Sequence, residues 1–187
     1  MIYPKKISSK KIDSFLNILI ISIIAVSVLL LIINWLVTPN LYWSHLCIIG
    51  FIYIFLTIRY SITKTTNLSG HVVLQTILLS ALIIFIDYRL GYKGWSINIS
   101  FPIVIIIANV TMFILTLINY KHYGKYAINQ LMIVLLSLLI VYFIYKGYTT
   151  YNILSAISIL ISIFNFLVSL ILCHRDFKEE IIKKFNI

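Results

Sequence analysis

The sequence predicts an all-α, polytopic integral membrane bundle of six transmembrane helices, arranged as three hairpins with short loops and followed by a C-terminal amphipathic helix. Two observations support this fold class. Apolar residues make up 61% of the chain and charged residues 11%, against about 45–50% and about 25% in soluble domains. The apolar residues also form six segments long enough to cross a ~30 Å hydrocarbon core, with lysines and arginines gathered at their ends.

Residues 1–14 form a basic arm, and the first helix is expected over residues 15–37. The arm resembles the start of a signal peptide, but the apolar run is too long and no small-residue cleavage site follows, so we expect the helix to be retained. Asp13 or Ser14 is a candidate N-cap, and Thr38-Pro39-Asn40 is a turn signal that ends the helix.

The other spans are expected at residues 42–60, 71–88, 100–120, 127–145 and 153–172, so that residues 15–172 form the transmembrane domain. Ser100 can cap the fourth helix, and Pro102 fits its first turn. Residues 173–187 form a cytoplasmic tail in which Phe177, Ile181 and Phe185 share one helical stripe. We expect a short helix that lies along the inner surface or continues the sixth span.

The basic residues predict the orientation. Twelve of the 15 lysines and arginines fall on the side of the termini, and three, Arg89, Lys93 and Lys146, fall on the other. This bias predicts a multi-pass protein of the cell membrane with both termini in the cytoplasm. The net charge of +10 then faces the anionic inner leaflet of the lipid bilayer, and no nucleic acid partner is expected. Cys47 and Cys173 fall on opposite sides, too far apart for a disulfide.

Hairpins recur about every 56 residues, because odd helices start near residues 15, 71 and 127 and even ones near 42, 100 and 153. One interpretation is a threefold parallel repeat of the kind that transporters use. The other is that short-looped helices of equal length must recur at about this interval.

The outer turn after the third span is the most distinctive stretch. Its candidate functional residues are Asp87, Arg89, Gly91, Lys93, Gly94 and Trp95. Asp87 lies on the helix face of Thr76 and Ser80, and Arg89 or Lys93 can partner its carboxylate. Asp87 is either a structural clasp for the turn or a contact for a cation or substrate at the outer mouth.

Polar residues follow one face of the sixth span at spacings of three and four. This helix-six seam consists of Ser155, Ser158, Ser162, Asn165 and Ser169. Ser27 and Asn34, Asn109 and Thr116, and Gln130 and Ser137 are further polar pairs seven residues apart on the first, fourth and fifth spans. In lipid, such faces serve close helix packing, or they line a polar pathway.

No catalytic signature is present, so no catalytic residue and no cofactor is predicted and an enzyme is not expected. A lipid-modifying enzyme with Asp87 as its acid is the third hypothesis. His71, His122, His174 and Cys173 fall on the cytoplasmic side, but their spacing is not that of a zinc site, so no metal is predicted.

The chain resembles an uncharacterised family of small multi-helix membrane proteins, a domain of unknown function found mainly in low-GC Gram-positive bacteria. The matching features are Tyr3-Pro4, Trp35 with Thr38-Pro39-Asn40 and Trp43, the stretch 87–97, Pro102, and the ending 179–187. Longer members of that family carry a cysteine-rich zinc ribbon before the Tyr-Pro pair. That ribbon is absent here, so the resemblance implies no zinc function, and it supplies no activity.

Two functions remain open. The leading hypothesis is a non-enzymatic sensor, scaffold or accessory subunit that binds a membrane protein partner, or a second copy of itself, through the outer turn and the inner tail. The alternative is a small transporter or channel for a polar solute or ion, built on the helix-six seam.

Overall fold

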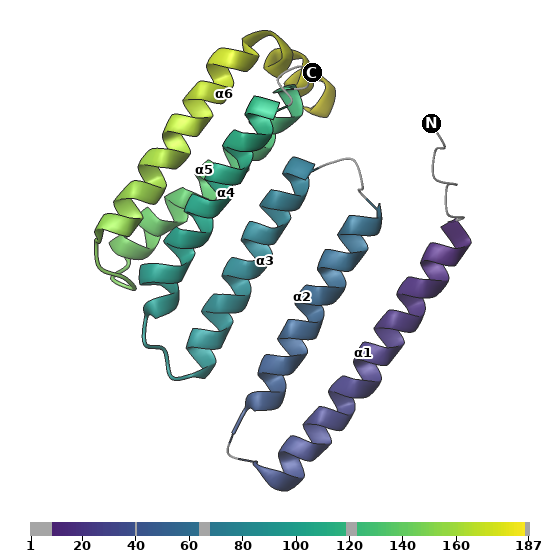
Figure 1. The fold of residues 1–187 in the computed structure, drawn as a ribbon. Coiled ribbons are helices and arrows are strands. Elements are labelled where there is room, and N and C mark those ends of the chain that lie inside the picture. The colour runs from purple at the N-terminus through teal and green to yellow at the C-terminus, as the bar shows by residue number, and fades with distance from the viewer. Residues whose placement is uncertain (1–8, 40, 64–67, 119–122, 186–187) are drawn as a thin grey trace. The chain divides into compact units, whose positions relative to one another are not determined.

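The structure is a computed structural model that describes residues 9–39, 41–63, 68–118 and 123–185, with side chains described within 11–39, 41–63, 68–118 and 128–171. The elements are α1 (Ser9–Val37), α2 (Trp43–Thr63), α3 (Leu68–Arg89), η1 (Ser96–Ser100), α4 (Phe101–Ile118), α5 (Tyr123–Tyr145) and α6 (Ile153–Phe185) (Figure 1). Six helices are long and apolar enough to cross a membrane. This confirms the predicted all-α fold with six candidate spans.

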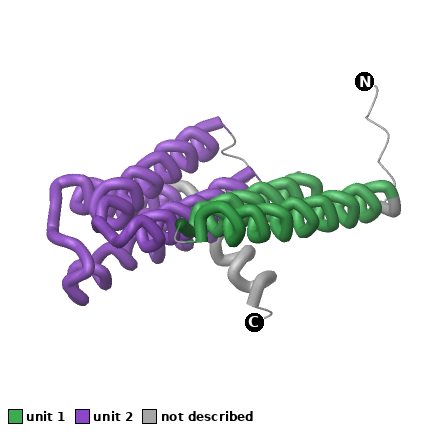
Figure 2. Tube along the Cα trace, turned by 90° about the horizontal axis from the view of Figure 1, so that it is seen from below, with its two compact units in different colours: residues 1–66 green, residues 67–187 purple. Residues whose placement is uncertain are grey.

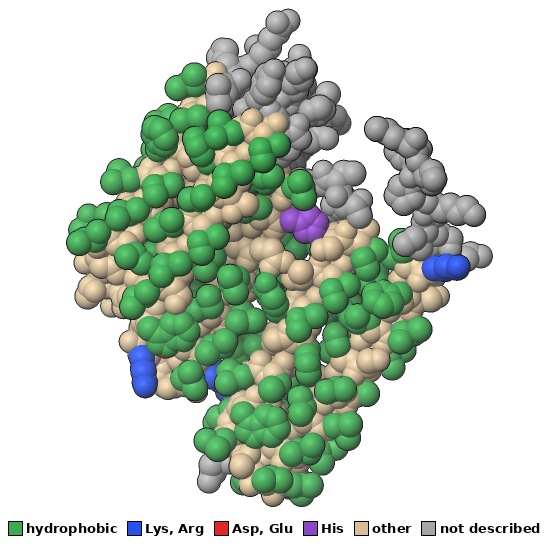
Figure 3. All heavy atoms as spheres, viewed as in Figure 1, with side chains coloured by type: hydrophobic (Ala, Val, Ile, Leu, Met, Phe, Trp, Pro, Cys, Tyr) green, Lys and Arg blue, Asp and Glu red, His purple; other side chains and the backbone are tan. Residues whose placement is uncertain are grey.

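The chain divides into two compact units, residues 1–66 and residues 67–187 (Figure 2). Unit 1 contains α1 and α2, and unit 2 contains α3 to α6 with η1. On the face drawn in Figure 3, hydrophobic side chains cover the helices and charged side chains are few. Large exposed aliphatic side chains, such as Leu36 and Ile171, are what helices in contact with lipid present.

Unit 1 is a helical hairpin whose turn is closed by polar side chains. Asn34 donates from Nδ2 to the Thr38 carbonyl at 3.1 Å and accepts the Ser44 backbone N–H at Oδ1, at 3.2 Å. Trp43 donates from Nε1 to Thr38 Oγ1 at 2.8 Å. Asn34 therefore joins the end of α1 to the start of α2, a local role that the packing interpretation of its face did not include.

The predicted cap of the first helix is wrong. Because α1 begins at Ser9, both Asp13 and Ser14 lie inside the helix. The residues before them, Lys10 to Ile12, do not break a helix, so the helix continues past the edge of the apolar run. α2 also extends three residues beyond its predicted end, to Thr63, and α3 starts three residues early, at Leu68.

Unit 2 is built around α4, which packs against α3, α5 and α6. Its buried side chains Phe101, Ile105, Ala108 and Met112 form one hydrophobic core with Val73 of α3 and with Ile133 and Ile140 of α5. Ile105, Ile133 and Ile140 have no exposed surface. Ile159 of α6 packs against this core, so the core contacts all four long helices of unit 2.

The start of the fourth span differs from its prediction. A π-helical turn, η1, precedes α4, and Trp95 occupies the cap position without a side-chain hydrogen bond. Ser100 is the last residue of this turn, so it is not a cap. Pro102 is the second residue of α4 and lies in its first turn, as predicted, although η1 continues the helical path before it. Proline has no N–H to give to the carbonyl four residues earlier, which is that of Asn98.

The sixth span continues as a single helix to Phe185. Of the two predicted arrangements for the tail, the structure shows a continuation of α6. Side chains beyond Ile171 lie outside the described part, so the apolar stripe of Phe177, Ile181 and Phe185 stays a prediction, as does the division of the chain into arm, transmembrane domain and tail.

Candidate functional site

The Asp87 carboxylate organises the turn between α3 and η1. Asp87 is fully buried. Its Oδ1 accepts the Lys93 backbone N–H at 3.0 Å, and its Oδ2 accepts the Ser96 backbone N–H at 3.3 Å and the Ser96 hydroxyl at 2.7 Å. These three donors are the kind that a buried carboxylate requires. The geometry is that of a clasp that ties the end of α3 to the start of η1.

The predicted cationic partners of Asp87 are placed differently from the expectation. Lys93 reaches the carboxylate through its backbone N–H, and its side chain is exposed. The guanidinium carbon of Arg89 lies 5.2 Å from the centre of the Phe85 ring, a cation–π arrangement within its own helix. Ser96, which was named only as part of the turn, supplies two of the three donors.

The glycines of the turn meet two different backbone requirements. Gly91 has φ of +92° and Tyr92 φ of +43°. The Tyr92 N–H donates to the Asp87 carbonyl at 2.9 Å and the Gly91 N–H to the Tyr88 carbonyl at 3.4 Å, which is the Schellman pattern for ending a helix. Gly94 has φ of +76°, and a Cβ there would lie 3.2 Å from Asn98 Nδ2. The backbone conformation thus favours glycine at position 94, and a side chain there would also crowd Asn98.

Asn98 connects this turn to the turn between α5 and α6. Its carbonyl, to which Pro102 has no N–H to give, accepts Asn152 Nδ2 at 2.7 Å. Its side-chain oxygen accepts the Thr149 hydroxyl and, at 3.3 Å, the Thr150 backbone N–H. Its side-chain nitrogen donates to the Gly94 carbonyl at 2.9 Å.

The second turn is fixed in its own right. Gly147 has φ of +74° and repeats the Schellman pattern of Gly91, with the Tyr148 N–H donating to the Phe143 carbonyl at 3.0 Å. Asn152 and Ser155 exchange side-chain and backbone bonds as a capping box at the start of α6. Tyr92 donates its hydroxyl to the Tyr148 carbonyl at 2.9 Å. We call the two joined turns, residues 87–98 and 147–152, the turn cap.

The interval of 56 residues recurs within unit 2. It separates Gly91 from Gly147 in the sequence, and two hydrogen-bonded pairs have the same separation, Tyr92 with Tyr148 and Asn165 with Asn109. In unit 1 the corresponding position is Trp35, which lies inside α1. The likeness therefore joins the hairpins α3–α4 and α5–α6 and does not extend to the turn of the first hairpin.

The helix-six seam faces neighbouring helices. All five of its residues are buried, with exposed fractions between 0 and 8%. The hydroxyls of Ser158, Ser162 and Ser169 donate to carbonyls of their own helix at 2.8–2.9 Å. Small side chains with this bonding let helices approach closely.

Asn109 of α4 is the centre of a buried polar network that joins three helices. It donates from Nδ2 to Ser162 Oγ at 2.8 Å, and its Oδ1 accepts Gln130 Nε2 of α5 at 2.7 Å. Asn165 Nδ2 donates to the Asn109 carbonyl at 3.0 Å. Asn109, Gln130 and the seam were predicted as polar faces, and the structure brings these three faces together.

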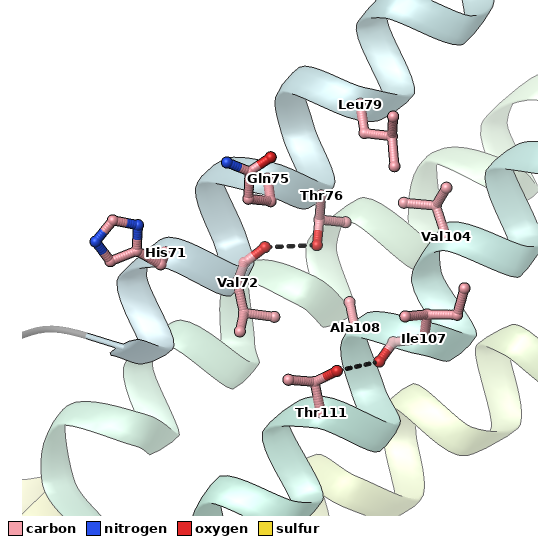
Figure 4. Close-up of a pocket in the computed structure, with 9 residues that line it drawn as sticks. All are labelled: His71, Val72, Gln75, Thr76, Leu79, Val104, Ile107, Ala108 and Thr111. Atoms are coloured by element: carbon pink, nitrogen blue, oxygen red, sulfur yellow. Dashed lines mark hydrogen bonds between the residues drawn. The ribbon is translucent and has the colours of Figure 1, made fainter. Parts of the chain in front are cut away.

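A groove of about 260 Å³ lies between α3 and α4 and is drawn in Figure 4. His71 and Gln75 stand on its α3 side. Thr76 and Thr111 donate their hydroxyls to carbonyls of their own helices, at 2.7 and 2.8 Å, so the groove is walled mainly by carbon. The Ser80 hydroxyl, one turn along α3 from Thr76, is buried without a hydrogen-bond partner.

Within the described residues, no three His, Cys, Asp or Glu side chains lie close enough to hold a metal ion. Of the candidate ligands named from the sequence, His71 lines the α3–α4 groove. The side chains of the other three candidates, His122, Cys173 and His174, are not among those that the structure describes, so the prediction that they bind no metal stays a prediction.

Asn98 and Asn152 are the residues of this site that sequence reasoning missed. A signal for Asn98 was present, because the residue four positions before a proline inside a helix has a carbonyl in need of a donor. Asn152 has no comparable local signal. Its side chain links two hairpins, and no local pattern predicts a partner that far away in the sequence.

Comparison with known proteins assigns a family but no activity. No curated protein and no solved structure matches the chain. One family model, described as a family of unknown function (DUF6320), matches residues 3–187, nearly the whole sequence. The chain therefore belongs to this family of unknown function.

Proposed function

We propose that this chain is a non-enzymatic scaffold or accessory subunit of a bacterial cytoplasmic membrane, and that it presents the turn cap to a partner protein on the outer side. The observation that carries the proposal is the state of the Asp87 carboxylate. Its hydrogen-bond donors lie within the cap, on Lys93, Gly94 and Ser96. A carboxylate that accepts hydrogen bonds from its own turn stabilises a rigid surface and is not presented to a substrate.

The surface of the cap fits a protein partner. Tyr88, Tyr148 and Tyr151 are 69%, 56% and 72% exposed. Tyrosine gives large contact area at low entropy cost, and a rigid backbone beneath it lowers the cost of binding further. The charge bias supports the outer location, since the cap side carries three basic residues against twelve on the other side.

Photo-crosslinking in cells tests the proposal. Benzoylphenylalanine is placed at Tyr88 and, separately, at Tyr151, with Leu160 on the exposed face of α6 as the matched control. We expect both cap positions to capture the same protein, or a second copy of this chain, while Leu160 captures lipid. A chain that gives no protein adduct from either cap position and runs as a monomer in mild detergent contradicts the proposal.

Orientation has its own test. In a variant with Cys47 and Cys173 replaced by serine, Lys93→Cys is expected to react with a membrane-impermeant maleimide added outside intact cells. Position 93 is exposed, so its labelling reports the side of the membrane rather than burial. Labelling only after the cells are opened would invert the topology.

Transport is the less supported alternative. A pathway along α6 requires polar groups that face water, whereas the described seam residues are buried and bonded to protein. Purified protein in liposomes is expected to show no flux of monovalent ions or small polar solutes above that of empty liposomes. Flux that is lost in an Asn109→Leu variant of unchanged helix content would favour transport instead.

A further inference from the structure

A second groove, of about 250 Å³, lies within unit 1 between α1 and α2, at the end of the hairpin away from its turn. Its apolar walls are Leu16 and Ile20 of α1 and Phe55 of α2. Charged and polar side chains line the same groove, namely Asp13 and Asn17 on α1 and Arg59 on α2. The groove thus offers a carboxylate, a guanidinium and an apolar slot to one ligand.

The two carboxylates whose side chains the structure describes have opposite roles. Asp87 is fully buried and bonded within the turn cap. Asp13 is exposed and lines the unit 1 groove, as does the exposed Arg59. A carboxylate at an otherwise basic end of a membrane helix weakens the binding of anionic lipid, because it repels the phosphate that the lysines attract. Its place in a groove beside an arginine suggests a ligand that carries both charges.

The depth of the groove selects the source of that ligand. Asp13 lies two residues before Phe15, where the long apolar run of α1 begins. Arg59 lies four residues, or about 6 Å, from the end of α2 at Thr63. Both charged residues therefore lie near the ends of apolar helical segments, where a phospholipid headgroup meets its acyl chains, and Leu16, Ile20 and Phe55 line the same groove.

We propose that the α1–α2 groove binds a phospholipid whose headgroup carries a primary ammonium beside its phosphate. Arg59 pairs with the phosphate, as its fork of donors favours. Asp13 accepts from the ammonium, and one acyl chain lies along Leu16, Ile20 and Phe55. A phosphatidylglycerol headgroup has no cation for Asp13, and the trimethylammonium of phosphatidylcholine has no N–H to donate to it. The site lies in unit 1, so it does not depend on the role proposed for the turn cap.

Native mass spectrometry of the full chain tests this directly. The protein is released from nanodiscs that contain equal amounts of phosphatidylethanolamine, phosphatidylglycerol and phosphatidylcholine with identical acyl chains. We expect retained phosphatidylethanolamine to exceed each of the others. Exposed charge pairs are weak, so the preference is expected to fall roughly 1.4-fold to fivefold in Asp13→Asn, and the retention of each lipid is expected to fall by a similar factor in Arg59→Gln. Lys11→Gln, which changes charge on the same end of α1 outside the groove, is the matched control.

The two substitutions are expected to change lipid retention in different ways. Asp13→Asn removes the discrimination among headgroups but keeps phosphate binding, whereas Arg59→Gln lowers retention of all three lipids. Because both residues are exposed, neither substitution is expected to unfold the chain. Circular dichroism of each variant checks the helix content. Equal retention of the three lipids by the wild type overturns the proposal. So does a preference for phosphatidylglycerol, or a preference that Lys11→Gln weakens as much as Asp13→Asn does.

Discussion

Units 1 and 2 are both made of apolar helices, yet they hold themselves together in different ways. In the apolar 18-residue stretches of α1 and α2, no residue is buried inside the protein. In the corresponding stretch of η1 and α4, 44% of the residues are buried. In unit 1 the side chains of Asn34, Thr38 and Trp43 close the turn with hydrogen bonds. Unit 2 has an apolar core, a polar network around Asn109 and the turn cap. Hydropathy therefore identifies the helices that can cross a membrane, but it does not predict which contacts hold each helix against its neighbours.

The largest effect is expected from Asp87→Ala. This change leaves two backbone N–H groups and the Ser96 hydroxyl without the charged acceptor that they share. We expect unit 2 to lose about 3 kcal/mol or more of unfolding free energy, measured by titration with sodium dodecyl sulfate in mixed micelles. Hydrogen exchange should rise across residues 87–98 and 147–152 and stay unchanged around residues 34–44. Equal loss of protection in both units would break the comparison.

Gly94→Ala is expected to be the next most damaging. It places a side chain at φ of +76° and within 3.2 Å of Asn98 Nδ2. The expected cost is about 2–3 kcal/mol in the same titration. Gly91→Ala is the control, since its φ is also positive but the space around it is open, and about 1 kcal/mol is expected there. If both variants cost the same, Asn98 does not restrict the turn.

Asn109→Ala tests the network inside unit 2. It removes contacts to Gln130 and Ser162 at once. Hydrogen bonds between membrane helices contribute modestly, so we expect a loss of about 1–2 kcal/mol. Ser158→Ala is the matched control because its hydroxyl bonds only to its own helix among the contacts described, and a change near zero is expected. Thermal unfolding followed by circular dichroism gives a second measure.

Ser80→Ala is expected to have the smallest effect, and of opposite sign. The Ser80 hydroxyl is buried without a partner, while Thr76, one turn away, donates to the Val72 carbonyl. Removing an unsatisfied buried group is expected to stabilise unit 2 by up to about 1 kcal/mol. Thr76→Val is the comparison, with a change near zero or slightly destabilising. A destabilising Ser80→Ala would show that this hydroxyl has a partner.

The sequence was sufficient for the fold class and for the identity of every span, because a run of apolar residues 18 or more long has few alternatives. It was less informative about ends. Asp13 and Ser14 had the right side chains for a cap, but Lys10 and Lys11 extend the helix beyond them. Ser100 does not cap α4, because a π-helical turn precedes that helix. The spacing of apolar residues does not predict such a turn.

The candidate site was predictable in its local part and not in its distant part. The residue types and the spacing of Asp87, Gly91 and Gly94 predict a structured turn. In the structure each of the three residues has a defined role in that turn. The partners of Asn98 come from residues 149–152, and nothing near position 98 points to them. Hydrogen bonds of this kind are set by how helices pack, which a single sequence does not display.

The proline at position 102 has a consequence for the order in which the chain is made. It leaves a carbonyl that is paired with Asn152, 54 residues further along. This hydrogen bond can form only after residue 152 has been synthesised, so the α5–α6 hairpin completes the polar contacts of the α3–α4 hairpin.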